Sequence, residues 1–161
     1  MGVSSITDTS ATVTIADPRF VHRIQGGTVS AKRVKHLAIP LTAEAEVNRL
    51  REQTKIIFVD FHGEATSEKI AFGHAFDGKV SAVVGTHTHV QTADEKILPG
   101  GTAYITDVGF CGAHDSVIGR EKGSIIDRFK TLMPVKMHLA TGGVQVDGVV
   151  IDVDETTGKA T

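Results

Sequence analysis

Two short apolar runs with a helix-like stretch between them constrain the fold of this chain most. Residues 56–59 are continuously apolar, and residues 80–84 are apolar except for Ser81, which is typical of strands that are buried on both faces. Between them, Thr66 or Ser67 can cap a helix that continues to about Phe76. Alternation of buried strands with helices predicts an α/β protein with a layered core.

The remaining elements follow from the same patterns. A helix over residues 43–53 is predicted, with apolar residues recurring on one side and Thr42 as its cap. A third buried strand is predicted over residues 104–108, and a short helix over residues 125–130. Further short strands, joined by glycine-rich turns, are expected at residues 11–15, 21–24, 135–139, 144–146 and 149–153.

Composition and charge restrict the classes of partner. The chain has 161 residues and a net charge of -2, and its hydrophobic and charged fractions of 40% and 22% are ordinary for a globular protein. Binding to long nucleic acid requires clustered Lys and Arg, so no long nucleic acid partner is expected. The cluster formed by Lys32, Arg33 and Lys35 is interpreted as solvated surface.

The cysteine content and the N-terminus favour a cytoplasmic location. Cys111 is the only cysteine, so an intramolecular disulfide is impossible, as suits a reducing compartment. Residues 1–10 are polar and lack the apolar run of a signal peptide. No stretch approaches the roughly 20 apolar residues of a membrane span, so no membrane partner is expected.

Three histidines lie just beyond the ends of predicted strands. His62 follows the strand at residues 56–59, and His87 and His89 follow the strand at residues 80–84. Carboxyl ends of adjacent strands in layered α/β folds converge where ligands bind, and residues two apart on an extended segment point the same way. Imidazole is the commonest metal-binding side chain, so these positions indicate a metal site.

The pattern alone leaves a second interpretation open, in which these histidines are structural or exposed. With 8 histidines in the chain, one pair spaced as His87 and His89 is readily produced by chance. His114, in a glycine-rich loop, is a weaker candidate that can reach the same site. Asp107, at the end of the third strand, is a candidate for orienting an imidazole.

Several long motifs resemble one known family. Residues 59–69 read VDFHGEATSEK and residues 83–94 read VVGTHTHVQTAD, and the similarity continues through residues 97–109, 115–119 and 148–152. These motifs are similar to those of the YmdB-type calcineurin-like metallophosphoesterases, and the resemblance covers about three-quarters of the chain.

The resemblance implies both a fold and an activity. The implied fold is a layered α/β-β-α sandwich, and the implied reaction is the metal-dependent hydrolysis of small phosphodiesters such as 2',3'-cyclic nucleotides. Two divalent metal ions are implied, Fe or Mn with Zn as an alternative. The residues matching His62 and His87 would bind one ion, and the residue matching His89 the other.

Departures from the family pattern lie at the N-terminus. The chain contains no Gly-Glu-Asn and no Gly-Asn-His segment, so the bridging carboxylate, the amide ligand and the catalytic histidine of the family are not assigned. Asp17 only superficially mimics the first ligand. Residues 1–40 are therefore interpreted as an atypical N-terminal segment, and residues 41–161 as the metallophosphoesterase-like C-terminal portion.

A sheet that lacks the family's N-terminal strands would have an open edge, which favours a homo-oligomer or another partner. The alternative function is a catalytically incomplete metal-binding or oligomer-forming module.

Overall fold

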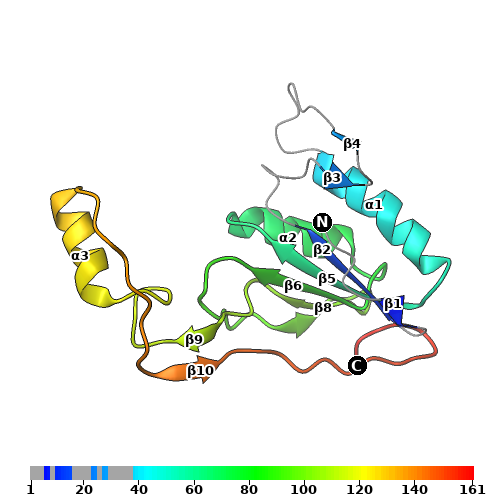
Figure 1. The fold of residues 1–161 in the computed structure, drawn as a ribbon. Helices are drawn as coiled ribbons and strands as arrows, with labels where there is room; N and C mark the ends of the chain where they lie inside the picture. The colour runs from blue at the N-terminus through cyan, green and yellow to red at the C-terminus, as the bar shows by residue number, and fades with distance from the viewer. Residues whose placement is uncertain (1–5, 8–9, 16–22, 25–26, 29–37) are drawn as a thin grey trace.

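The computed structural model describes residues 6–7, 10–15, 23–24, 27–28 and 38–161. A mixed sheet of six strands, in the order β1-β2-β5-β6-β8-β7, forms its centre (Figure 1). Strands β2, β5, β6 and β8 are parallel, and the short strands β1 and β7 pair antiparallel at the two edges. The six strands are β1 (Ile6–Thr7), β2 (Ser10–Ile15), β5 (Ile56–His62), β6 (Ala82–Thr86), β8 (Ala103–Ile105) and β7 (Lys96–Ile97). The predicted α/β class is confirmed.

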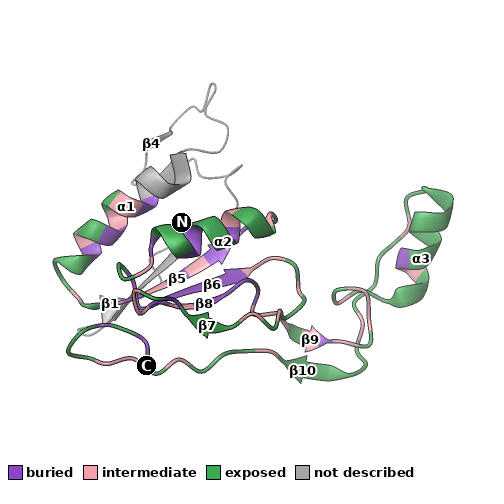
Figure 2. Ribbon diagram, turned by 180° about the vertical axis from the view of Figure 1, so that it is seen from behind, coloured by how far each residue is buried: buried purple, intermediate pink, exposed green. Residues whose placement is uncertain are grey.

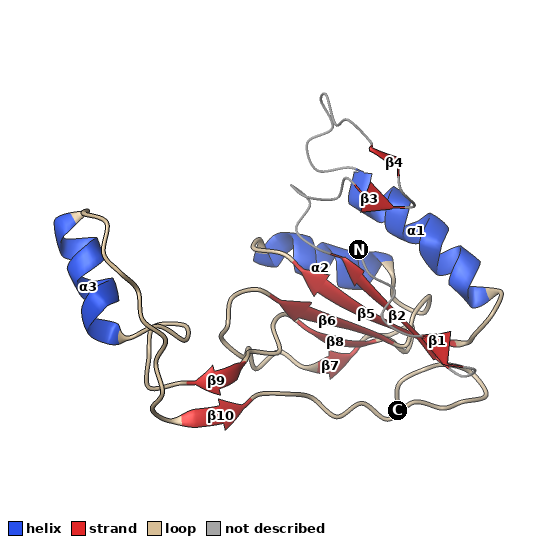
Figure 3. Ribbon diagram, viewed as in Figure 1, coloured by secondary structure: helices blue, strands red, loops and turns tan. Residues whose placement is uncertain are grey.

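Helices α1 (Ala38–Arg51) and α2 (Thr66–Ala75) cover one face of this sheet (Figure 3). The core lies between them and the strands: Val47 and Leu50 of α1 and Phe72 of α2 are buried with Ile57 and Val59 of β5. Helix α1 begins four residues before the predicted cap at Thr42. Proline is tolerated in the first turn of a helix, where no intrahelical N–H is required, so Pro40 does not delay its start.

Strand β5 is longer than predicted and is buried mainly on one face. Ile57, Val59 and Phe61 are at most 1% exposed, whereas the residues that alternate with them are half-buried. Residues on opposite faces of a strand alternate, so Asp60 and His62 share the face away from the helices. The apolar run at residues 56–59 therefore does not reflect full burial on both faces.

Strand β2 pairs with β5 along its whole length. The register runs from Ser10 opposite Ile56 to Ile15 opposite Phe61. The prediction of a strand at residues 11–15 is thus confirmed, and β2 and then β1 lie on this side of β5. The division of the chain at residue 41 stays a prediction.

Residues 111–146 extend away from the sheet (Figures 1 and 2). Strands β9 (Cys111–Ala113) and β10 (Val144–Val146) form an antiparallel pair, and α3 (Lys122–Thr131) projects from the segment between them. Helix α3 confirms the helix predicted at residues 125–130. A further antiparallel pair is formed near the N-terminus by β3 (Arg23–Ile24) and β4 (Gly27–Thr28).

Two of the predicted C-terminal strands are wrong. Residues 135–139 make a single bridge, from Leu139 to Arg120, and residues 149–153 make one from Val153 to Ala160. The latter segment passes over the second face of the sheet, where Val149, Ile151 and Val153 help to line a cavity of about 460 Å³. An apolar alternation becomes a strand only where a neighbouring strand pairs with it, and among the described residues neither segment has one.

Candidate metal centre at the carboxyl ends of the strands

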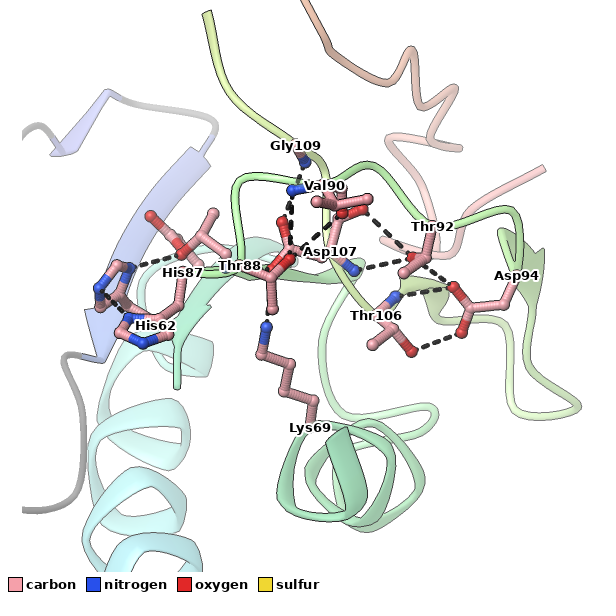
Figure 4. A network of polar contacts seen from close by, with 12 residues as sticks. His62, Lys69, His87, Thr88, Val90, Thr92, Asp94, Thr106, Asp107 and Gly109 are labelled. Atoms are coloured by element: carbon pink, nitrogen blue, oxygen red, sulfur yellow. Dashed lines mark hydrogen bonds and ion pairs between the residues drawn. The ribbon is translucent and has the colours of Figure 1, made fainter. Parts of the chain in front are cut away.

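His62 and His87 lie side by side at the carboxyl edge of the parallel sheet. His62 is the last residue of β5, and His87 follows β6 directly, one residue after Thr86, which is opposite His62 in the register. His62 Nε2 is 3.1 Å from His87 Nδ1, and the two rings meet edge to face with centroids 4.8 Å apart (Figure 4). Neighbouring parallel strands thus bring these two imidazoles together.

The orientation of His62 is fixed through Thr86 and Asp60. The hydroxyl of Thr86 donates to Asp60 Oδ1 at 2.8 Å, and the Thr86 hydroxyl oxygen is 3.0 Å from His62 Nδ1. Since the hydroxyl proton is directed at Asp60, Thr86 accepts from His62, which assigns the proton of the neutral ring to Nδ1. The lone pair of Nε2 then points towards His87, as a metal ligand requires.

The separation of the two nitrogens fits two ligands of one cation. At a metal–nitrogen distance of about 2.0–2.1 Å, two ligands lie about 2.9 Å apart at a right angle and about 3.4 Å apart at a tetrahedral angle. The observed 3.1 Å lies between these values. The part of the chain that the structure describes contains no group of three or more His, Cys, Asp or Glu side chains that could hold a metal ion.

His89 lies apart from the other two histidines, at a second position. Its ring stacks on Phe110 with centroids 5.1 Å apart, and its Nδ1 is 3.4 Å from the carbonyl oxygen of Ile118. Phe110 in turn stacks on His114, which is 3.4 Å from Asp147 Oδ2. The three rings border a cavity of about 460 Å³. His114 therefore reaches the surroundings of His89 and not those of His62.

The turn that carries His87 and His89 has an unusual backbone. His87 has φ of 113° and His89 has φ of 61°, values that side chains with a Cβ rarely adopt. Such conformations cost about 1–3 kcal/mol each and persist where surrounding contacts enforce them. The amide of Thr88, between the two histidines, donates to Asp107 Oδ2 at 3.0 Å (Figure 4).

Gly85 allows the strand beneath this turn to approach its neighbour closely. A methyl group at this position would overlap the backbone carbonyl oxygen of Thr106. The carbonyl of Gly85 accepts from the amide of Val108 at 2.8 Å, which joins the end of β6 to the segment after β8. The glycine before the His-Thr-His motif is thus required by packing between strands.

Asp107 and Lys69 form a buried ion pair below the turn. Lys69 Nζ, from α2, lies 2.8 Å from Asp107 Oδ2, and the two side chains are 1% and 0% exposed. Burial opposes ionisation of Asp107, but hydrogen bonds from Lys69 and from the amides of Thr88 and Gly109 outweigh it and lower the pKa of this carboxyl below its ordinary value. Asp107 is thus held as a carboxylate that accepts from three donors.

Four further histidines, Asp17 and the basic cluster are separate from this site or lie outside the described residues. His74 and His138 are exposed, away from the paired histidines. His22, His36 and Asp17 fall outside the described residues, as do Lys32, Arg33 and Lys35. Sequence reasoning missed Asp60 and Thr86. The period of two on β5 would have placed Asp60 beside His62, whereas Thr86 is identified only by the strand register.

Comparison with known protein families identifies the family of this chain. The family model described as YmdB-like protein matches residues 10–161, almost the entire chain. The chain belongs to the YmdB-like family. The match includes the segments that carry His62, His87 and His89, and it extends upstream through β2.

Relatives in this YmdB-like family are longer than the chain. It is 55% identical over 120 residues to a 2',3'-cyclic-nucleotide 2'-phosphodiesterase of Bacillus subtilis, a match that covers 74% of this chain and 46% of the relative. It is 46% identical over 111 residues to a putative phosphatase/phosphodiesterase of Mycoplasma pneumoniae, with coverages of 68% and 40%. The chain thus spans less than half the length of these relatives.

Solved structures support the fold of the YmdB-like chain. A crystal structure of a phosphatase from Mycoplasma pneumoniae superposes with a TM-score of 0.77 and 34% identity, over 99% of this chain and 53% of that one. A hypothetical protein from Thermus thermophilus superposes with a TM-score of 0.67, also at 34% identity, over 84% and 48% of the two chains. The layered α/β arrangement is therefore shared with a phosphatase structure.

Proposed function

We propose that this chain provides the His-bearing part of a metal-dependent phosphodiesterase site that acts on small phosphodiesters such as 2',3'-cyclic nucleotides. The observation that carries the proposal is the 3.1 Å approach of His62 Nε2 and His87 Nδ1 at the carboxyl edge of the sheet. The activity named for the Bacillus subtilis relative supports the choice of substrate class.

The residues of the chain have distinct roles in this proposal. His62 and His87 hold one divalent ion, Fe or Mn with Zn as an alternative, and His89 belongs to a second position. Thr86 and Asp60 keep the proton of His62 on Nδ1, so that its other nitrogen faces the ion. When bound, the metal supplies positive charge at the phosphoryl oxygens and lowers the pKa of a water ligand. No residue of the described part is assigned as the general acid.

Replacement of His87 by alanine tests the proposal. We expect Mn²⁺-dependent hydrolysis of bis(p-nitrophenyl) phosphate to fall about 100-fold or more, because one of the two paired nitrogens is lost. His138→Ala is the matched control, since His138 is exposed and distant from the pair. Equal turnover by the wild type and His87→Ala would contradict a catalytic role for this site.

A second candidate function is a catalytically incomplete module that binds metal or associates with a partner that supplies the missing ligands. The observation that favours it is the convergence of only two imidazole nitrogens within the described residues. Metal content and turnover discriminate the two functions. At most one ion per chain without turnover supports the module, and two ions per chain contradict it.

We also propose that the chain forms a homo-oligomer through α3. Phe129, Leu132 and Met133 are 74%, 85% and 63% exposed on or just after this projecting helix, where apolar side chains gain from burial against a partner. The mass in solution, measured by light scattering, is expected to exceed that of one chain, and Leu132→Asp is expected to reduce it to that of the monomer. A monomeric wild type would contradict this proposal.

Location and membrane association rest on fewer observations. None of the helices in the described ranges is long and apolar enough to cross a membrane. The cytoplasmic location stays a prediction from the single cysteine, Cys111, which is exposed and unpaired by any disulfide.

A further inference from the structure

The turn between His87 and His89 is held from beneath by one acceptor. The Thr88 amide donates to Asp107 Oδ2 at 3.0 Å, which fixes the peptide plane that joins His87 to Thr88. The side chain of Thr88 is exposed, so burial of that side chain does not enforce the positive φ angles on either side of it. The hydrogen bond to Asp107 instead holds the amide of Thr88, between the two residues with positive φ.

Asp107 is itself immobilised by contacts from three different segments. Lys69 Nζ reaches it from α2 at 2.8 Å, and the Gly109 amide donates to its other carboxylate oxygen at 3.0 Å. Its backbone N–H donates to Thr92 Oγ1 at 2.9 Å, and its carbonyl accepts from the Thr92 amide at 3.0 Å (Figure 4). The acceptor for Thr88 is therefore held at its side chain and at its backbone.

An apolar pair in place of Lys69 and Asp107 could fill the same space. It would avoid the desolvation of two charges, which in buried ion pairs often exceeds the attraction gained. It would, however, leave the amides of Thr88 and Gly109 without an acceptor. The ion pair places a fixed carboxylate below the histidine turn, whereas an apolar pair would place no acceptor there.

We propose that Asp107 and Lys69 are positioning residues of the metal site. Asp107 holds the His87–His89 turn through the Thr88 amide, and Lys69 holds the Asp107 carboxylate in place. The inference rests on the proposed function, because it assigns these two residues to the geometry of the metal ligands.

Metal affinity measured calorimetrically with Mn²⁺ tests the positioning. Asp107→Asn presents an amide NH₂ where one of the donors now finds an oxygen, so we expect Mn²⁺ binding to weaken about 10- to 100-fold. The double variant Lys69→Met with Asp107→Asn removes the unpaired charge and is expected to regain stability over Lys69→Met alone. Its Mn²⁺ affinity is nevertheless expected to stay at least about 10-fold below that of the wild type. A double variant that binds Mn²⁺ as the wild type does would overturn the proposal.

A matched control separates positioning from folding. Asp77 also accepts from backbone amides, those of Gly100 at 2.8 Å and Thr102 at 3.4 Å, but at the amino end of the parallel strands. Asp77→Asn is expected to lower stability and leave Mn²⁺ affinity unchanged at temperatures where the chain is folded. An equal loss of affinity in Asp77→Asn and Asp107→Asn would overturn the proposal, since the effect would then be one of general stability.

Amide hydrogen exchange in the unmodified chain provides a test that needs no variant. Because the Thr88 amide is bonded to a buried carboxylate, its exchange is expected to be at least about 10-fold slower than that of Val90, whose amide is 3.3 Å from the Thr88 hydroxyl at the surface. Equal protection of the two amides would overturn the positioning. A wild type that binds no Mn²⁺ contradicts the proposed function instead, and the exchange of Thr88 still decides the positioning.

Discussion

Replacing Lys69 by methionine is expected to lower the free energy of unfolding by about 3–5 kcal/mol. Methionine occupies nearly the same volume, so the change is mainly the loss of the charge that faces Asp107 at 2.8 Å. Asp107 would remain almost fully buried without its cationic partner, although the amides of Thr88 and Gly109 would still donate to it. Breaking a buried pair from one side leaves an uncompensated charge, which is the costly case.

Denaturation in urea at neutral pH measures this loss, and Lys79→Met is its control. Lys79 forms an ion pair with Glu44 at the same distance of 2.8 Å, but both side chains are 44% exposed. Exposed pairs contribute about 0–1 kcal/mol, so the control is expected to change little. Similar losses of stability in Lys69→Met and Lys79→Met would contradict the cost assigned to the uncompensated buried charge of Asp107.

Replacing Phe61 by alanine is also expected to cost about 3–5 kcal/mol, the range typical of phenylalanine-to-alanine changes in a core. Phe61 is 1% exposed on the helix-facing side of β5 and stacks on Phe72 with centroids 4.7 Å apart. Phe72 stacks in turn on Phe76 at 4.3 Å, so the substitution opens a cavity at the end of a row of three rings.

The same denaturation experiment checks the Phe61 variant against Val150→Ala. Val150 is 95% exposed, and substitutions at such surface positions usually change stability by no more than about 0.5 kcal/mol. Asp60 and His62 point to the opposite face of β5 from Phe61, so the variant tests the core and not the ligands directly. A loss below about 1 kcal/mol would contradict the burial of this ring between the sheet and α2.

The local pattern of the sequence was enough to predict the central α/β unit. The apolar stretches at residues 56–59 and 80–84 became β5 and β6, and the helical stretch between them became α2. The predicted cap at Thr66 or Ser67 is wrong, because Ala65 occupies the N-cap position and no side chain caps the helix. The same patterns failed at residues 135–139 and 149–153, because pairing in a sheet depends on a neighbour that may be distant in the chain. Alternation of apolar residues favours a strand but does not supply its partner.

The candidate site was likewise predicted only in part from the sequence. The position of His62 and His87 at strand ends was readable from the sequence, since the carboxyl ends of parallel strands share one edge. The spacing of His87 and His89 suggested that they point the same way, as on an extended segment. Their positive φ angles instead separate them, with His87 beside His62 and His89 against Phe110.

By itself, the sequence determined which strand ends carry imidazole side chains, because strand period and residue chemistry are local properties. Only the tertiary structure decided the burial of Lys69, which in the sequence is an ordinary lysine on a predicted helix. The packing of α2 against the sheet buries its ammonium group beside Asp107, 38 positions away. Contacts between segments so far apart arise from packing, and no local pattern encodes them.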